Sequence, residues 1–330
     1  MRLLVTGGAG FIGSHIVELA LEHGLEVAVL DDLSNGLLDN VPRDVPFYHT
    51  DLRDADGVHA VLNDFRPDVI SHQAAQASVG NSIRDPLHDA QVNVSGTLHL
   101  LEASRRSGVR RVVFASTGGA IYGEVRPTRK ATPHWPAQPE SPYATSKLAC
   151  EAYLATYARQ YGLEHVILRY ANVYGPRQNP HGEAGVIAIF CRSIREGAPL
   201  RIYAMNTLGD EGCIRDYVYV RDVARANVSA ALGKPLPRIL NVGTGRATTT
   251  KGLVRTMQRI CRLDVRVDQQ PPRAGDLQRS VLDALDFTTH FGPPTRLSVG
   301  LAETMRSFGV LPVARRTPAG AVLTPSLASD

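Results

Sequence analysis

A tyrosine and a lysine four residues apart have the clearest chemical potential in this chain. They are Tyr143 and Lys147, in the segment Ser141-Pro142-Tyr143-Ala144-Thr145-Ser146-Lys147. Positions i and i+4 share one face of a helix, so the phenol and the ammonium can point into the same site. A free tyrosine has a pKa of about 10, and a neighbouring positive charge favours the phenolate. Tyr143 is therefore a candidate general base. The alternative is an unrelated surface pair at a common spacing.

A glycine-rich loop near the start of the chain is the second chemical signal. Gly7, Gly10 and Gly13 follow an apolar segment and open an amphipathic one, with Phe11 and Ile12 at the first positions of that helix. Glycines permit a tight turn and let the backbone approach a pyrophosphate. The free N–H groups and the dipole of a helix N-terminus favour phosphate. The loop predicts dinucleotide binding in this strand–helix context, and the alternative is a tight turn alone.

An acidic residue at the end of the second strand indicates which dinucleotide is bound. Asp31 lies eighteen residues beyond Gly13. A carboxylate at this place accepts hydrogen bonds from a ribose 2′-OH and repels a 2′-phosphate, so NAD is favoured over NADP. Asp32 and Asn35 are further candidates for cofactor contact. Asp32 could instead cap the loop Ser34-Asn35-Gly36.

Two hydroxyl side chains, Ser116 and Thr117, follow the strand predicted at Val112–Ala115. Ligands of open α/β sheets bind at the carboxyl ends of the strands. A hydroxyl at this place can bridge Tyr143 and a substrate hydroxyl. The alternative is that the two residues cap the turn into Gly118-Gly119.

The elements that must position these residues alternate along the chain. Strands are predicted at Arg2–Thr6, Glu26–Asp31, Pro46–His49, Val69–Gln73, Val112–Ala115 and His165–Tyr170, with helices near Phe11–Gly24, Asp54–Phe65, Asn93–Ser107 and Tyr143–Tyr161. Repeated strand–helix units with continuous apolar strands predict an α/β fold with a doubly wound parallel Rossmann sheet. Residues 1–175 are expected to form this domain. Residues 176–314 are expected to form a smaller mixed α/β C-terminal substrate lobe with segments returning to the first domain, and 315–330 a disordered tail.

Composition excludes several classes of protein. The 330 residues are 43% hydrophobic and 21% charged, as in ordinary globular chains, and no apolar run is long enough for a transmembrane helix. The net charge of +4 is too small to indicate nucleic-acid binding. The cysteines and histidines show no spacing typical of a metal site. The apolar segment before the glycine loop is too short for a signal peptide, so we expect a cytoplasmic protein with reduced cysteines.

Taken together, these motifs resemble the extended short-chain dehydrogenase/reductase family and, within it, the NAD-dependent sugar-nucleotide epimerases. The resemblance covers roughly residues 1–310. It is carried by the glycine loop, Asp31, Asp51-Leu52, His72-Gln73-Ala74-Ala75, Asn93-Val94-Ser95-Gly96-Thr97, Ser116-Thr117, Tyr143 with Lys147, Leu168-Arg169-Tyr170-Ala171-Asn172-Val173-Tyr174-Gly175-Pro176, Arg215-Asp216-Tyr217 and Arg273-Ala274-Gly275-Asp276.

The resemblance implies roles for residues along the whole chain. Asp51 and Leu52 would flank the adenine, Ala74 and Ala75 would line the middle of the cofactor, and Asn93, Ser116 and Tyr170 would complete its site. Asn172, Arg215 and Arg273 would contact the diphosphate of the substrate, and Asp276 would hold the uridine ribose. Arginine forks suit phosphate and a carboxylate suits a diol. Ser280 replaces an aromatic residue of many relatives, which leaves room for an N-acetylated sugar.

The chain departs from the family pattern after the fifth predicted strand. Aligned from Phe114, Thr117 takes the position of the catalytic hydroxyl. Aligned backwards from Tyr122, Gly118 takes this position and no hydroxyl stands there. Ser116 is the alternative candidate for the hydroxyl. Related dehydratases carry Asp-Glu after this threonine, whereas Gly118-Gly119 stand here, which disfavours dehydration.

The activity implied by the resemblance is interconversion of UDP-sugars at C4, with UDP-glucose/UDP-galactose and UDP-GlcNAc/UDP-GalNAc as substrate pairs. Tyr143 would take the proton of the 4′-OH while hydride passes to NAD, and the resulting 4-keto sugar would be reduced on its other face. The relatives form homodimers through a four-helix bundle, and the helices near Asn93–Ser107 and Tyr143–Tyr161 would supply it here. A UDP-uronic-acid epimerase or decarboxylase on the same scaffold, and a non-enzymatic NAD(H) sensor, are the alternatives.

Overall fold

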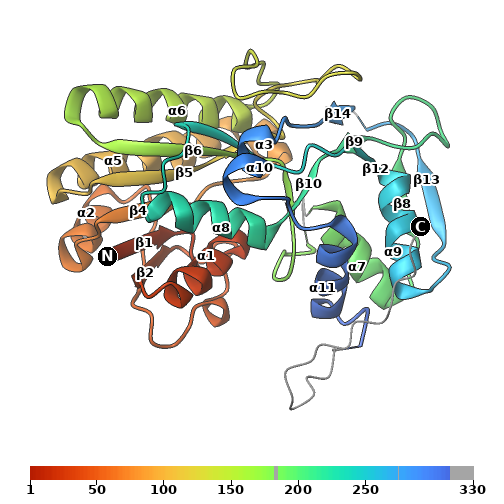
Figure 1. Cartoon of the computed structure of the whole chain (residues 1–330), viewed down its shortest axis with the longest axis horizontal. Helices are drawn as coiled ribbons and strands as arrows, with labels where there is room; N and C mark the ends of the chain where they lie inside the picture. The colour runs from red at the N-terminus through yellow and green to blue at the C-terminus, as the bar shows by residue number, and fades with distance from the viewer. Residues whose placement is uncertain (182–184, 274, 313–330) are drawn as a thin grey trace.

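A seven-stranded parallel sheet forms the centre of the computed structural model, which describes residues 1–181, 185–273 and 275–312 (Figure 1). The strand order is β11-β6-β5-β4-β1-β2-β3. Their bounds are β1 (Arg2–Thr6), β2 (Glu26–Asp31), β3 (Phe47–His49), β4 (Val69–His72), β5 (Arg111–Thr117), β6 (Glu164–Tyr170) and β11 (Ile239–Val242). The order reverses direction at β1, which is flanked by β2 and β4. This arrangement confirms the predicted doubly wound Rossmann sheet.

Both faces of the sheet are buried because the strands are apolar on both sides. Leu3 packs in a core cluster with α1 and α8, whereas its neighbour Leu4 packs in a second cluster with α2, α5 and α6. The first layer is α1 (Phe11–Glu22) and α8 (Val220–Ala231), and the second is α2 (Ala55–Phe65), α5 (Gly96–Ser107) and α6 (Pro142–Tyr161) (Figure 1). Full burial of one such leucine contributes about 1.5–3 kcal/mol.

The connection between β4 and α5 is itself helical. It contains α3 (Val79–Arg84), α4 (Pro86–Ala90) and a π-helical turn, η2 (Gln91–Ser95), that runs directly into α5. A short turn, η1 (Leu38–Asn40), follows β2. The helices α3 and α4 both pack against α6. The catalytic candidates on α6 therefore have a helical neighbour that the sequence did not predict.

A smaller lobe lies beyond the carboxyl ends of the sheet strands (Figure 1). Its core joins α7 (Val186–Glu196), α9 (Thr250–Cys261) and α11 (Leu297–Ser307). Small sheets complete it: β7 (Asn172–Tyr174) with β10 (Tyr217–Tyr219), β8 (Leu200–Tyr203) with β13 (Val267–Gln270), and β9 (Ile214–Arg215) between β12 (Thr248–Thr249) and β14 (Arg279–Ser280). This lobe confirms the predicted fold class.

Segments after residue 175 return to the first domain. The strand β11 pairs with β6, α8 packs on α1, and α10 (Leu285–Phe291) packs on β11. The boundary at 175 and 176 stays a prediction, and the predicted tail at 315–330 lies outside the described residues. Across the described ranges, no helix combines the length and apolarity needed to cross a bilayer.

The fifth strand is longer than the sequence predicted. We expected it to end at Ala115, but pairing with β6 continues through Ser116 opposite Arg169 and Thr117 opposite Tyr170. Both hydroxyl residues are therefore held in a strand instead of a turn. Backbone pairing overrides the local signal of the glycines that follow.

Candidate active site

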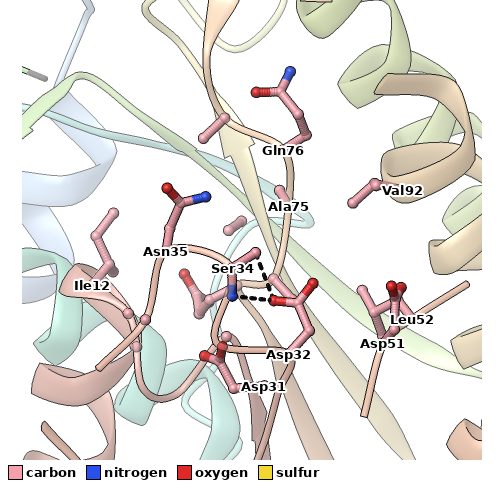
Figure 2. Close-up of a pocket in the computed structure, with 18 of the residues that line it drawn as sticks. Ile12, Asp31, Asp32, Ser34, Asn35, Asp51, Leu52, Ala75, Gln76 and Val92 are labelled. Carbon is pink, nitrogen blue, oxygen red and sulfur yellow. Dashed lines mark hydrogen bonds between the residues drawn. The ribbon is translucent and has the colours of Figure 1, made fainter. Parts of the chain in front are cut away.

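A cavity of about 560 Å³ opens at the carboxyl ends of β1, β2, β4 and β5. This volume lies within the ~300–1,000 Å³ that is typical of small-molecule sites. The glycine loop lies at one side of it, and Tyr143, Lys147 and Tyr170 lie at another. The predicted cofactor residues that line it are Gly7, Gly10, Phe11, Ile12, Gly13, Asp31, Asp32, Asn35, Asp51, Leu52, Ala74, Ala75, Ser116, Tyr143, Lys147 and Tyr170. Figure 2 shows several of these side chains around the cavity.

The glycine loop has no room for side chains. A Cβ on Gly7 would lie 2.6 Å from the Ala74 nitrogen, and a Cβ on Gly13 would overlap the Gly7 oxygen. Gly7 also has φ +68°, which L side chains rarely adopt. No side chain caps the N-terminus of α1 at Gly10. The loop therefore presents close-packed backbone and helix N–H groups to the cavity, which fits the pyrophosphate of a dinucleotide.

The two aspartates after β2 have different partners. The Asp31 carboxylate accepts from Ala9 N at 3.0 Å and from Leu33 N at 2.9 Å. Burial raises its pKa. A carboxylate has about four lone-pair sites, so two remain for a ribose diol. Asp32 accepts from the amide and the hydroxyl of Ser34 (Figure 2). Asp32 thus caps the loop, as one of the two predicted alternatives stated, and it also lines the cavity.

One predicted cofactor residue does not line the cavity. Asn93 is 3% exposed. Its side-chain oxygen accepts from Gln76 N, and its side-chain nitrogen donates to Gln76 O. Asn93 thus holds the Gln76 loop in place, and Val92 next to it faces the cavity instead (Figure 2). Direct contact between Asn93 and the cofactor stays a prediction, and Asn93 lies in the π-helical turn η2.

Two of the catalytic candidates, Tyr143 and Lys147, line the cavity, and Thr117 lies beside Tyr143. Ser141 caps α6 by accepting from Ala144 N at 3.2 Å, and Pro142 occupies the first helical turn. This start places Tyr143 in the first turn and Lys147 one turn later. The Thr117 hydroxyl is close enough to Tyr143 to lower the pKa of its phenol. Of the predicted alternatives, Thr117 is therefore the hydroxyl that the structure brings to Tyr143, because β5 extends to this residue.

The protein's own groups do not lower the pKa of the base. The pKa of the Tyr143 phenol is raised to about 12, because burial and the Asp89 carboxylate outweigh the effect of the Thr117 hydroxyl. The Lys147 ammonium donates to the Ala115 carbonyl at 3.1 Å, and burial lowers its pKa. Lys147 by itself therefore does not bring the pKa of Tyr143 into the neutral range. The remaining source of positive charge is the nicotinamide ring of a bound cofactor.

Ser116 points into a buried ionic network behind the site. Its hydroxyl donates to Glu151 Oε1 at 2.5 Å, and Glu151 is paired with Arg169 through both carboxylate oxygens. Arg169 also donates to the Tyr122 hydroxyl at 2.9 Å. All four side chains are buried. The network joins β5, α6 and β6, the elements that carry the catalytic candidates and Tyr170.

The predicted substrate residues lie outside the cavity. Thr117, Asn172, Arg215, Arg273, Asp276 and Ser280 all fall within the described ranges, and none of them lines it. Two of these residues are near each other: a Cβ on Gly119 would lie 3.8 Å from both Asn172 Nδ2 and Thr117 Oγ1. Ser280 is 2% exposed in β14, where it pairs with Arg215 of β9.

The two other substrate candidates bind each other. Arg273 donates to both carboxylate oxygens of Asp276, at 3.0 and 2.8 Å. The Cys213 thiol is within electrostatic reach of both Arg215 and Asp276. Arg215 and Asp276 are thus brought to one part of the lobe although 61 residues separate them in the sequence.

The sequence analysis missed several residues of the site. Gln73 lines the cavity and accepts from the Tyr170 hydroxyl at 3.1 Å, and Asn227 donates to the same hydroxyl at 2.8 Å. Gln76 also lines the cavity (Figure 2). A polar residue on the apolar face of a predicted helix was the available signal for Asn227. The fully buried Asp89, in the helical connection before α5, offered no such signal.

Comparison with known proteins gives consistent matches over nearly the whole chain. The family model "NAD dependent epimerase/dehydratase family" matches residues 3–243. The UDP-glucose 4-epimerase of Mycolicibacterium smegmatis is 43% identical over 315 residues, which cover 93% of this chain and 98% of that protein.

Two solved structures are similar to this one. The UDP-glucose 4-epimerase of Thermus thermophilus in complex with NAD is 54% identical with a TM-score of 0.90, covering 94% of this chain and 99% of that chain. The Thermotoga maritima UDP-glucose 4-epimerase with UDP-glucose is 43% identical with a TM-score of 0.88, at the same coverage.

Proposed function

This chain belongs to the NAD-dependent epimerase/dehydratase family, and we propose that it interconverts UDP-sugars at C4, with NAD as its cofactor. The observation that carries the proposal is that Tyr143 and Lys147 line the same cavity as the glycine loop, with Thr117 beside Tyr143. Relatives with NAD and with UDP-glucose bound support it.

The glycine loop would hold the cofactor's pyrophosphate and Asp31 its adenosine ribose. When bound, NAD accepts a hydride from the sugar and later returns it, so the reaction has no net oxidation. The residues of the chain handle the proton. Tyr143 Oη takes it from the 4′-hydroxyl and gives it back when the hydroxyl re-forms. Thr117 would orient the phenol, and the positive charges of Lys147 and of a bound nicotinamide would together favour the phenolate.

We propose that the diphosphate and the nucleoside of the substrate bind on the smaller lobe. Asn172 is near Thr117 across Gly119, which suits a group that continues from the reacting sugar. Arg215 and Arg273 supply planar forks for phosphate, and Asp276 supplies a carboxylate for the uridine ribose. The short side chain of Ser280 is consistent with a site that also admits N-acetylated sugars. Whether it does is an outcome of the experiment below.

A homodimer is part of the proposal. The face of α6 turned to solvent carries Ala152, Tyr153 and Thr156, and Tyr153 is 39% exposed. Helix α5 contacts α6 and presents the half-buried Leu98. Small and aromatic side chains on two adjacent helices suit a four-helix bundle with a second copy. In analytical ultracentrifugation, Ala152→Arg should convert a dimer to a monomer. A wild-type protein that sediments as a monomer contradicts the proposed homodimer.

The test of the function is NMR of the purified protein with UDP-galactose, followed by UDP-GalNAc, with no NAD added. Conversion of UDP-galactose to its 4-epimer supports both C4 epimerisation and a retained cofactor. Conversion of UDP-GalNAc would show that the space at Ser280 is used. If neither sugar is converted, even with NAD supplied, C4 epimerisation of these sugars is wrong. The same assay with a UDP-uronic acid then tests the alternative substrate class.

A further inference from the structure

Asp89 is a buried carboxylate with three neutral hydrogen-bond donors. It lies in α4 with 0% exposure. One oxygen accepts from Gln76 Nε2 at 2.8 Å and Asn93 Nδ2 at 3.0 Å, and the other accepts from Ser146 Oγ at 2.6 Å. Aspartate is almost never fully buried unless it is paired, because taking a charge out of water is costly. Its three donors compensate part of this cost, and the Lys147 ammonium is a buried positive charge on which Asp89 acts.

The donors of Asp89 belong to two different parts of the site. Gln76 lies in the loop that lines the cofactor cavity, and Asn93 holds the same loop through its backbone. Ser146 lies on α6, one residue before Lys147. Asp89 thus connects the wall of the cavity to the helix that carries Tyr143 and Lys147. Both contacts are between segments far apart in sequence, so they form only in the folded chain.

Four other titratable groups surround the Tyr143–Lys147 pair. His72 of β4 bonds Thr6 and Thr97, and burial keeps its pKa low, at about 3, so it is neutral. Cys150 is a buried thiol on α6 with a raised pKa. The phenol of Tyr170 also faces Tyr143, and burial raises its pKa. Glu151 acts on Lys147 as well, but its carboxylate is already paired with Arg169. Asp89 also acts on Lys147, it is bonded to the residue before Lys147, and all of its own donors are neutral.

We propose that Asp89 is a positioning residue for the epimerisation: it serves as the buried counter-charge of Lys147 and ties the catalytic helix to the wall of the cofactor cavity. It does not touch the reacting atoms, and the inference rests on the proposed function. The charge of Asp89 also acts on the phenol, because it is one of the groups that raise the pKa of Tyr143.

The proposal predicts the direction in which a neutral replacement moves the pH profile. Asp89→Asn keeps the shape and can keep all three hydrogen bonds, since the Ser146 hydroxyl can also accept. Without the negative charge, Tyr143 loses its proton at lower pH, so the acid limb of the kcat profile shifts to lower pH. Lys147 also loses its proton at lower pH, so the alkaline limb shifts to lower pH as well. Removal of one nearby charge should shift each limb by about one pH unit.

The experiment compares three variants of the NAD-loaded protein with the wild type. Asp89→Asn removes the charge, Ser146→Ala removes one hydrogen bond and keeps the charge, and Asp222→Asn removes another buried carboxylate, on α8 away from the site. For each we would measure the pH dependence of kcat, the NAD content after denaturation, and the near-ultraviolet titration of tyrosinate relative to Tyr143→Phe.

The expected result is that both limbs of the kcat profile, and the titration of Tyr143, shift to lower pH in Asp89→Asn and in neither other variant. Unshifted limbs in a folded, NAD-containing Asp89→Asn protein would overturn the counter-charge role. An equal shift in Asp222→Asn would overturn it as well. If Asp89→Asn does not fold, a shift of about one pH unit in Ser146→Ala, which keeps the charge, refutes the role of charge, and an unshifted profile supports it because loss of the hydrogen bond alone then does not move the limbs. A wild type that does not convert UDP-galactose refutes the proposed function, and the tyrosinate titration still tests Asp89.

Discussion

Two adjacent hydroxyl residues should have separable effects on catalysis and on stability. Thr117 lies beside Tyr143, whereas Ser116 donates to the buried Glu151 at 2.5 Å. Thr117→Val removes the hydroxyl from the catalytic group and keeps the shape of the side chain. Ser116→Ala leaves that group intact and removes a hydrogen bond from a buried carboxylate. The two substitutions therefore test which hydroxyl takes part in the reaction.

The substitution of Thr117 should lower kcat, whereas the substitution of Ser116 should lower Tm. Loss of one preorganised donor at a reacting group costs about 10²–10³-fold in kcat, so Thr117→Val should lose about that much with little change in Tm. A hydrogen bond to a buried charged group contributes about 1.5–3 kcal/mol. For a chain of this length, that loss in Ser116→Ala should lower Tm by about 2–4 °C, while kcat changes only a few-fold.

The assay is steady-state conversion of UDP-galactose together with thermal unfolding of the NAD-loaded protein. Ser229→Ala on α8 is a matched hydroxyl control away from the cavity, and it should change neither quantity measurably. The reasoning would be refuted if Ser116→Ala lost kcat by 10²-fold or more while Thr117→Val kept wild-type turnover. That result would assign the catalytic role to the hydroxyl of Ser116.

Three further predictions follow from the same contacts. Tyr143→Phe should abolish turnover and leave NAD bound, because the phenol hydroxyl is the base while the cofactor is held by the glycine loop; full activity of this variant would refute the assignment. Gly13→Ala should yield protein with little NAD after purification, because its Cβ would overlap the Gly7 oxygen; Gly252→Ala on α9, where the nearest atom is a threonine hydroxyl at 2.9 Å, is the control. Turnover should rise with pH through its acid limb, because burial raises the pKa of Tyr143 to about 12 and only the phenolate accepts the proton; a pH-independent kcat from about pH 5 to 9 would contradict this.

Local patterns predicted most strands and the long helices of the first domain, and most of the residues that line the cavity. Continuous apolar strands of β1 and β2 predict burial on both faces, because their alternate residues have no polar side to expose. The glycine loop and Asp31 occur next to elements that periodicity already defines. Their places in the site follow from connectivity, since the carboxyl ends of parallel strands meet at one edge of the sheet.

The sequence alone could not decide which residue supplies the catalytic hydroxyl. Alignment from Phe114 and alignment from Tyr122 gave different residues, because the extra residue can be placed on either side of Gly118. Pairing of β5 with β6 favours Thr117, since the ladder continues to Thr117 opposite Tyr170, and its catalytic role stays a prediction. Successive strand residues point to opposite sides, which separates Ser116 from Thr117.

The doubly wound sheet, the dinucleotide loop, the acidic residue at the end of β2 and the Tyr143–Lys147 pair could all be predicted along the chain, because each depends on spacing within one element or on one strand–helix joint. The electrostatics of the site, in contrast, arise from folding alone. Asp89 of α4 reaches Ser146 of α6 across 57 residues, and Arg169 of β6 reaches Glu151 of α6. Burial and the charge of Asp89 raise the pKa of Tyr143, and neither is encoded in local spacing.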